Sequence, residues 1–60
     1  MFTLQIKTGN AAFGYDREEA TREVVRVLKK VIDQIQYGYD EKAIMDINGN
    51  KVGEWRFDFE

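Results

Sequence analysis

The 60-residue chain has no histidine, no cysteine and no proline. It therefore lacks the usual neutral-pH base, the thiolate nucleophile, the imidazole and thiolate metal ligands, and any disulfide bond. No apolar run is long enough to cross a membrane, and residues 1–7 alternate in polarity instead of forming the basic start and apolar stretch of a signal peptide. We expect a non-enzymatic cytoplasmic protein with no cofactor, no metal site and no membrane association.

The composition is that of a folded domain. Hydrophobic residues make up 43% of the chain and charged residues 33%, which is too apolar for a disordered tail. A chain of this length buries only about 60% of the surface that its unfolded form exposes, so its stability should be marginal. No internal repeat or linker divides the sequence, and we expect a single domain over residues 1–60.

The first two elements are predicted from periodicity. Apolar and polar residues alternate over residues 2–8, which is typical of a strand with one buried face. Over residues 20–35 the apolar positions fall within an arc of about 160°, which predicts an amphipathic helix wide enough to pack on a sheet. Asp16 is the expected N-cap of this helix, and Gly38 should end it.

The last third of the chain predicts a β-hairpin. Two apolar runs, residues 43–47 and 52–59, flank Asn48-Gly49-Asn50. Asp46 at the start of a type I turn and Gly49 in the left-handed region suit a three-residue loop with a bulge, while Asn48-Gly49 as a two-residue turn is the alternative. We choose the three-residue loop because it gathers the apolar side chains on one face. The predicted core face of the hairpin then holds Ala43, Met45, Ile47, Gly53, Trp55, Phe57 and Phe59.

The order strand, helix, strand, strand predicts a two-layer α+β domain, β-α-β-β, with one amphipathic helix on a three-stranded sheet. A right-handed crossover makes the first two strands parallel, and the third strand, antiparallel to both, fits between them. The third strand also carries the most aromatic residues, as suits a central position. We expect the strand order 1-3-2, with 1-2-3 as the alternative.

Two aliphatic side chains fall outside this predicted core. On the chosen register, Ile44 and Val52 lie on the sheet face turned away from the helix. Two such residues on an open face are ordinary, but inside an acidic rim they could also form a docking patch for a protein. The predicted partner-binding residues are Ile44, Val52, Asp46, Glu54 and Asp58. The acidic rim favours a basic protein partner, and self-association as a homodimer is the alternative.

A basic cluster on the outer face of the predicted helix suggests a second class of function. Its members are Arg22, Arg26, Lys29 and Lys30. Clustered cations can neutralise nucleic-acid phosphates, so a nucleic-acid-binding module is the alternative function. Glu23 and Asp33 lie among these cations, however, and the net charge of −2 opposes the approach of nucleic acid. We do not expect nucleic acid to bind.

Two stretches, Asn10-Ala11-Ala12-Phe13 and Asp-x-Asn-Gly-Asn-x-Val-Gly-x-Trp over residues 46–55, carry a resemblance. They are similar to a group of short uncharacterised proteins encoded by bacteriophages and prophages, and the likeness covers residues 2–55. The resemblance implies a small accessory protein of a mobile element that works by binding a host or phage protein. It carries over no catalytic or ligand-binding residues. The sequence therefore predicts a small non-enzymatic protein-binding accessory protein that acts through its open sheet face.

Overall fold

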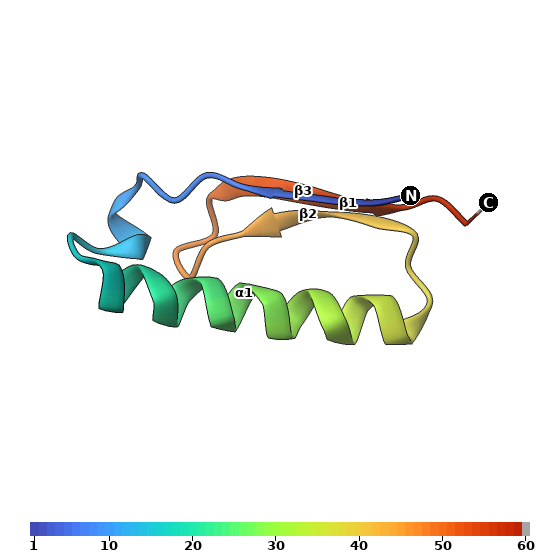
Figure 1. Cartoon of the computed structure of the whole chain (residues 1–60), viewed down its shortest axis with the longest axis horizontal. Coiled ribbons are helices and arrows are strands. Elements are labelled where there is room, and N and C mark those ends of the chain that lie inside the picture. The colour runs from blue at the N-terminus through green and yellow to red at the C-terminus, as the bar shows by residue number, and fades with distance from the viewer. Residues whose placement is uncertain (60) are drawn as a thin grey trace.

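The computed structural model describes residues 1–59, which form a sheet with a helix against one face (Figure 1). The elements in chain order are β1 (Phe2–Ile6), the short 3-10 helix η1 (Ala11–Phe13), α1 (Arg17–Tyr37), β2 (Glu41–Met45) and β3 (Lys51–Phe57). β3 lies between β1 and β2 and is antiparallel to both. The predicted α+β fold and the strand order 1-3-2 are confirmed.

α1 begins and ends where the sequence predicts. The Asp16 carboxylate accepts a hydrogen bond from the Glu19 N–H at 2.8 Å, and the Glu19 carboxylate accepts one from the Tyr15 N–H at 2.9 Å. The first bond satisfies a backbone donor that has no partner within the first turn of the helix, and the second ties the residue before the N-cap to that turn. At the other end the Gly38 N–H donates to the carbonyls of Gln34 and Ile35.

The hairpin between β2 and β3 has the predicted three-residue loop. The Gly49 N–H donates to the Asp46 carbonyl at 3.0 Å, and the Asp46 N–H donates to the Asn50 carbonyl at 2.8 Å. Gly49 has a φ of 85°, in the left-handed region that only glycine adopts without strain. The turn therefore has the bonds and the left-handed glycine expected of the predicted loop.

The register changes immediately beyond this turn. Met45 pairs with Lys51, whereas Ile44 pairs with Gly53, so Val52 is an extra residue on β3 and forms a β-bulge. Side chains alternate between the two faces of a strand, and one extra residue therefore reverses the face assignment on one side of the bulge. This second irregularity follows the turn and was not predicted.

The bulge corrects the prediction for Ile44 and Val52. Both were expected on the open face, but they are only 4% and 6% exposed and belong to the core beneath α1. Ile44 pairs with Gly53, which lies on the same face as the buried Trp55. The prediction was wrong because it continued the register of the turn through the whole hairpin.

The same shift moves predicted core residues outward. Ala43 and Met45 are exposed on the opposite face of β2, and Ile47 is exposed in the loop. Phe57 keeps the helix-facing side, since it pairs with Phe2, but it is only partly covered, and Phe59 lies exposed beyond the end of β3. Of the predicted hairpin core, only Trp55 is buried, and Gly53 is half-buried.

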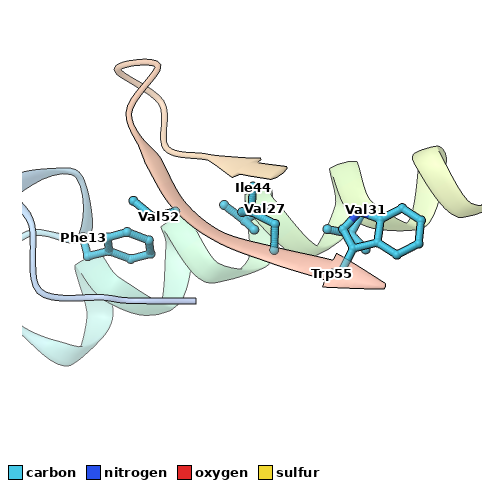
Figure 2. Packing of buried hydrophobic residues seen from close by; sticks show 6 residues of the cluster. All are labelled: Phe13, Val27, Val31, Ile44, Val52 and Trp55. Atoms are coloured by element: carbon cyan, nitrogen blue, oxygen red, sulfur yellow. The ribbon is translucent and has the colours of Figure 1, made fainter. Parts of the chain in front are cut away.

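The core is a single row of side chains between the sheet and α1. Figure 2 shows Val52 near Phe13, Ile44 near Val27, and Trp55 near Val31. The indole N–H of Trp55 donates to the Gln34 side chain at 2.8 Å, which satisfies the polar atom of a fully buried ring. The expectation that Trp55 packs under the helix is confirmed.

Gly53 gives a test of the bulge. A methyl group at this position would overlap the backbone carbonyl oxygen of Gln5 on β1, so the β1–β3 pairing would have to move apart. We expect Gly53→Ala to lower the free energy of unfolding by about 2 kcal/mol or more. Gly9→Ala is the control, because a methyl group there meets nothing within 4 Å and should change stability by no more than about 0.5 kcal/mol. Urea unfolding followed by Trp55 fluorescence measures both, and equal midpoints would contradict the close approach of the strands.

Candidate protein-interaction surface

The sheet face turned away from α1 is charged. Glu54 and Asp58, two members of the predicted patch, are exposed and paired with cations: Lys51 Nζ lies 3.7 Å from Glu54, and Arg56 Nε lies 3.0 Å from Asp58. Arg56 also lies 3.9 Å from Glu41 across the sheet. Because Ile44 and Val52 are in the core, this face lacks the aliphatic pair on which the predicted docking patch depended.

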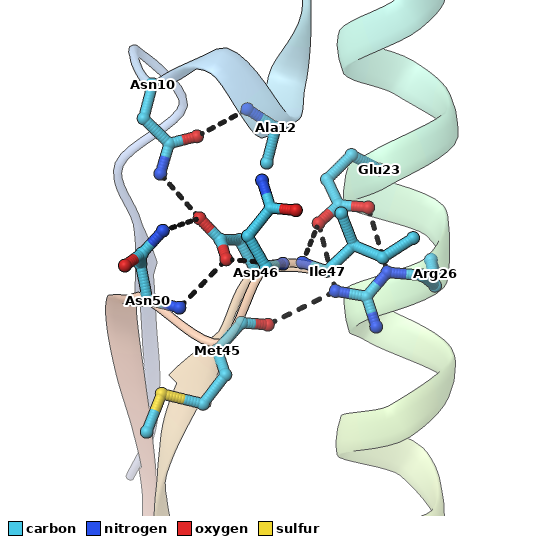
Figure 3. A network of polar contacts seen from close by, with 9 residues as sticks. Asn10, Ala12, Glu23, Arg26, Met45, Asp46, Ile47 and Asn50 are labelled. Carbon is cyan, nitrogen blue, oxygen red and sulfur yellow. Dashed lines mark hydrogen bonds and ion pairs between the residues drawn. The ribbon is translucent and has the colours of Figure 1, made fainter.

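Asp46, the remaining member of the predicted patch, is buried inside the hairpin. Its Oδ1 accepts from the backbone N–H groups of Asn48 at 2.8 Å and Asn50 at 2.9 Å, and its Oδ2 accepts from the side chain of Asn10 at 2.7 Å (Figure 3). The Asn50 N–H, followed by the Asn10 amide, lowers the pKa of Asp46, although burial acts in the opposite direction. Asp46 therefore holds the turn together and ties it to the loop that precedes η1.

A second carboxylate joins the hairpin to α1. Glu23 is buried, and its two oxygens accept from Arg26 Nε at 2.8 Å and Nη2 at 2.9 Å, while the Ile47 N–H donates to it at 3.0 Å. Arg26 Nη2 also donates to the Met45 carbonyl at 3.2 Å (Figure 3). The bond from Arg26 lowers the pKa of Glu23. Every buried side-chain polar atom of the described chain has a hydrogen-bond partner, so this network is structural.

The predicted basic cluster does not form one phosphate-binding site. Arg26 is engaged by Glu23 and the Met45 carbonyl, and Arg22 Nη1 lies 3.2 Å from Glu18. Lys30 lines an open cleft of about 370 Å³ between α1 and β2, whereas Lys29 lies about 100° from it around the helix. Two of the four cations are thus occupied and the other two diverge, so the arrangement adds nothing in favour of nucleic-acid binding.

The exposed aliphatic residues of α1 lie along one line. Val25, Leu28 and Ile32 are 43%, 38% and 53% exposed, although all three belong to the apolar arc of residues 20–35 that was expected to pack on the sheet. Together with Thr21 and the half-buried Ile35 they recur at alternating spacings of four and three residues, which is the pattern of a seam between two packed helices. We call these five residues the α1 seam.

The α1 seam lies on the β1 side of the molecule. Arg26 contacts β2 through the Met45 carbonyl, and at 100° per residue Leu28 lies about 200° and Ile32 about 240° around the helix from Arg26. β1 and β2 are the two edges of the sheet. The seam therefore points away from β2, toward the side on which β1 is the edge strand.

β1 borders the seam with an open edge. Within residues 1–59 it pairs only with β3. Its helix-facing side chains are apolar: Leu4 and Ile6 are half-buried and Phe2 is exposed. We call β1 and the α1 seam together the lateral surface. The alternation of β1 and the width of the apolar arc of α1 were visible in the sequence, but the rotation of α1 that leaves the seam uncovered was not.

A comparison of the chain with known protein families, curated proteins and solved structures finds no match. Residues 1–59 contain no helix of the length and hydropathy required to span a bilayer. The same residues bring together no group of three or more acidic side chains that could hold a metal ion.

The two buried carboxylates predict sensitivity to acid. Both have a pKa that folding lowers, so their stabilising contribution is complete at neutral pH and is lost as the pH falls through about 4 and below. We expect Glu23→Gln to cost about 1.5–3 kcal/mol at pH 7. The difference from the wild type should shrink as the pH falls below the ordinary range of a glutamate pKa and Glu23 itself becomes protonated.

Glu18→Gln is the control for this prediction, because Glu18 makes an exposed ion pair with Arg22. Its unfolding free energy should stay within about 0.5 kcal/mol of the wild type at neutral and acidic pH. Urea unfolding at a series of pH values measures all three proteins. A Glu23→Gln difference that is the same at pH 3 and pH 7 would contradict a stabilising role for the ionised carboxylate.

Proposed function

We propose that this chain is a small non-enzymatic protein-binding accessory protein that acts through the lateral surface. The observation that carries the proposal is the uncovered α1 seam beside the open edge of β1. Single exposed aliphatic residues are ordinary on protein surfaces. A continuous line of them next to the open edge of a strand offers a partner both apolar contacts and main-chain hydrogen bonds.

The two edges of the sheet differ in a way that supports this surface. Edge strands are commonly protected by charged side chains or by covering groups. On the β2 edge, Arg26 bonds the Met45 carbonyl, and Lys42 lies on the strand itself. Within β1 the outward residues of the open face are the uncharged Thr3 and Gln5. The β1 edge is thus the one that is left available for pairing.

The buried carboxylates support the non-enzymatic part of the proposal. A general acid that works at neutral pH needs a pKa raised toward 7. Hydrogen bonds lower the pKa of both Glu23 and Asp46, and those bonds leave the two groups engaged within the fold. The cytoplasmic location and the origin in a phage or prophage belong to the proposal as well, and they rest on the sequence alone.

A pair of matched variants tests the proposed function. Ile32 lies in the α1 seam, and Met45 lies on the opposite side of the molecule with a similar exposed fraction, 46% against 53%. Immobilised wild type and Met45→Glu should capture the same proteins from a lysate of the producing cell, whereas Ile32→Glu should lose them, because a charge at a seam position opposes apolar docking. Identical captured sets for all three proteins would contradict the use of this surface.

A further inference from the structure

The flank of α1 that faces β2 carries a cleft that the proposed function does not use. The cleft lies between α1 and β2 and has a volume of about 370 Å³. We infer that it binds a medium-chain carboxylate, with the apolar chain in the cleft and the carboxylate between Lys30 and Lys42. The inference is independent of the proposed function, because the α1 seam lies on the other flank of the helix.

The lining of the cleft is apolar with cations at its exposed margin. Lys30 and Lys42 are exposed, and no Asp or Glu of the described chain lines the cleft. An apolar wall with a few polar groups is typical of sites for small organic molecules, which have volumes of roughly 300–1,000 Å³. This cleft is at the small end of that range and suits a chain of moderate length. Three of its lining residues belong to the core: Val27, Val31 and Ile44.

Lys30 and Lys42 lie level with each other on the two walls. Ile44 lies near Val27 (Figure 2), and α1 and β2 run in opposite directions, joined by residues 38–40. Lys30 is three residues beyond Val27, which is about 4.5 Å along the helix axis. Lys42 is two residues before Ile44, which is about 6.6 Å along the strand in the same direction. Both side chains line one cleft, so a single anionic group can lie between them.

Neither lysine is neutralised within residues 1–59. The ion pairs of this part of the chain include neither Lys30 nor Lys42. Lys42 Nζ lies 4.4 Å from the centre of the Tyr39 ring, a cation–π contact that orients the ammonium group and leaves its charge in place. Two like charges at one level of a cleft repel each other, and an anion between them attracts both. The charges therefore favour a carboxylate over an uncharged head group.

The two ends of the cleft differ, which sets the direction of the ligand. Arg26 Nη2 donates to the Met45 carbonyl at 3.2 Å and joins the two walls at the Met45 end. At the other end Lys30 also lines a neighbouring hollow that holds Asp33, whose charge would repel a carboxylate. The apolar chain therefore extends from the lysines toward Met45, and the carboxylate stays on the near side of Asp33.

Gln34 connects the cleft to a spectroscopic reporter. Its side chain lines the cleft, and its Oε1 accepts the indole N–H of Trp55 at 2.8 Å. Trp55 is the single tryptophan of the chain, so its indole N–H gives one signal in a proton–nitrogen correlation spectrum. A ligand beside Gln34 changes the surroundings of that N–H and moves the signal.

Titration with octanoate, followed by the indole signal of Trp55, tests the site. The signal should move saturably below the concentration at which octanoate forms micelles, with a Kd of about 1 mM or lower. Octanol has the same chain without the charge, and it should bind at least about fivefold more weakly. A signal that does not saturate, or equal affinities for octanoate and octanol, would overturn the inference.

Three lysine variants test the placement of the carboxylate. Lys30→Gln and Lys42→Gln should each weaken octanoate binding about threefold or more and leave octanol binding unchanged. Lys29→Gln is the control, because Lys29 lies about 100° around the helix from Lys30 and does not line the cleft. All three side chains are exposed, and urea unfolding checks that the variants keep the stability of the wild type. Equal weakening by Lys29→Gln, or unchanged octanoate affinity in both cleft variants, would overturn the assignment.

Discussion

The β-bulge at Val52 determines which side chains this small domain can bury. Beyond the tight turn at Gly49, one extra residue in β3 moves Ile44 from the open face to the helix-facing side, next to Trp55. The bulge depends on Gly53, because the carbonyl oxygen of Gln5 occupies the space in which any other residue would place its Cβ. A domain of 60 residues has few large apolar side chains available, and the alternative register would leave Ile44 in water.

A polar network complements the bulge at the same end of the sheet. Asp46 holds the turn from inside, and Glu23 and Arg26 connect α1 to the Ile47 N–H and the Met45 carbonyl. A lone buried carboxylate destabilises a protein, but these two accept hydrogen bonds on both oxygens. The network therefore determines how α1 is positioned along β2. The apolar row of the core alone would allow the helix to rotate, since aliphatic contacts are non-directional.

The sequence predicted the structure correctly wherever the prediction depended on a few neighbouring residues. The Asp16 cap, the Gly38 terminus and the Asp46–Gly49 turn each depend on a few adjacent residues, and the strand order follows from the direction of chain connections. The predicted docking patch was wrong because the β-bulge depends on the close approach of β1 to Gly53. No local sequence pattern encodes that contact. Glu23 shows the same limit: its spacing to Arg26 is typical of an exposed ion pair, and only the hairpin makes it a buried acceptor.

The polar network and the exposed lateral surface both follow from the orientation of α1 about its own axis. The contacts of Glu23 and Arg26 draw one flank of the helix toward β2, and the opposite flank, which carries Leu28 and Ile32, turns away from the sheet. The apolar arc of the helix is wider than a three-stranded sheet covers from that position. A line of exposed side chains at seam spacing beside the uncharged edge strand is therefore the surface on which the proposed function rests.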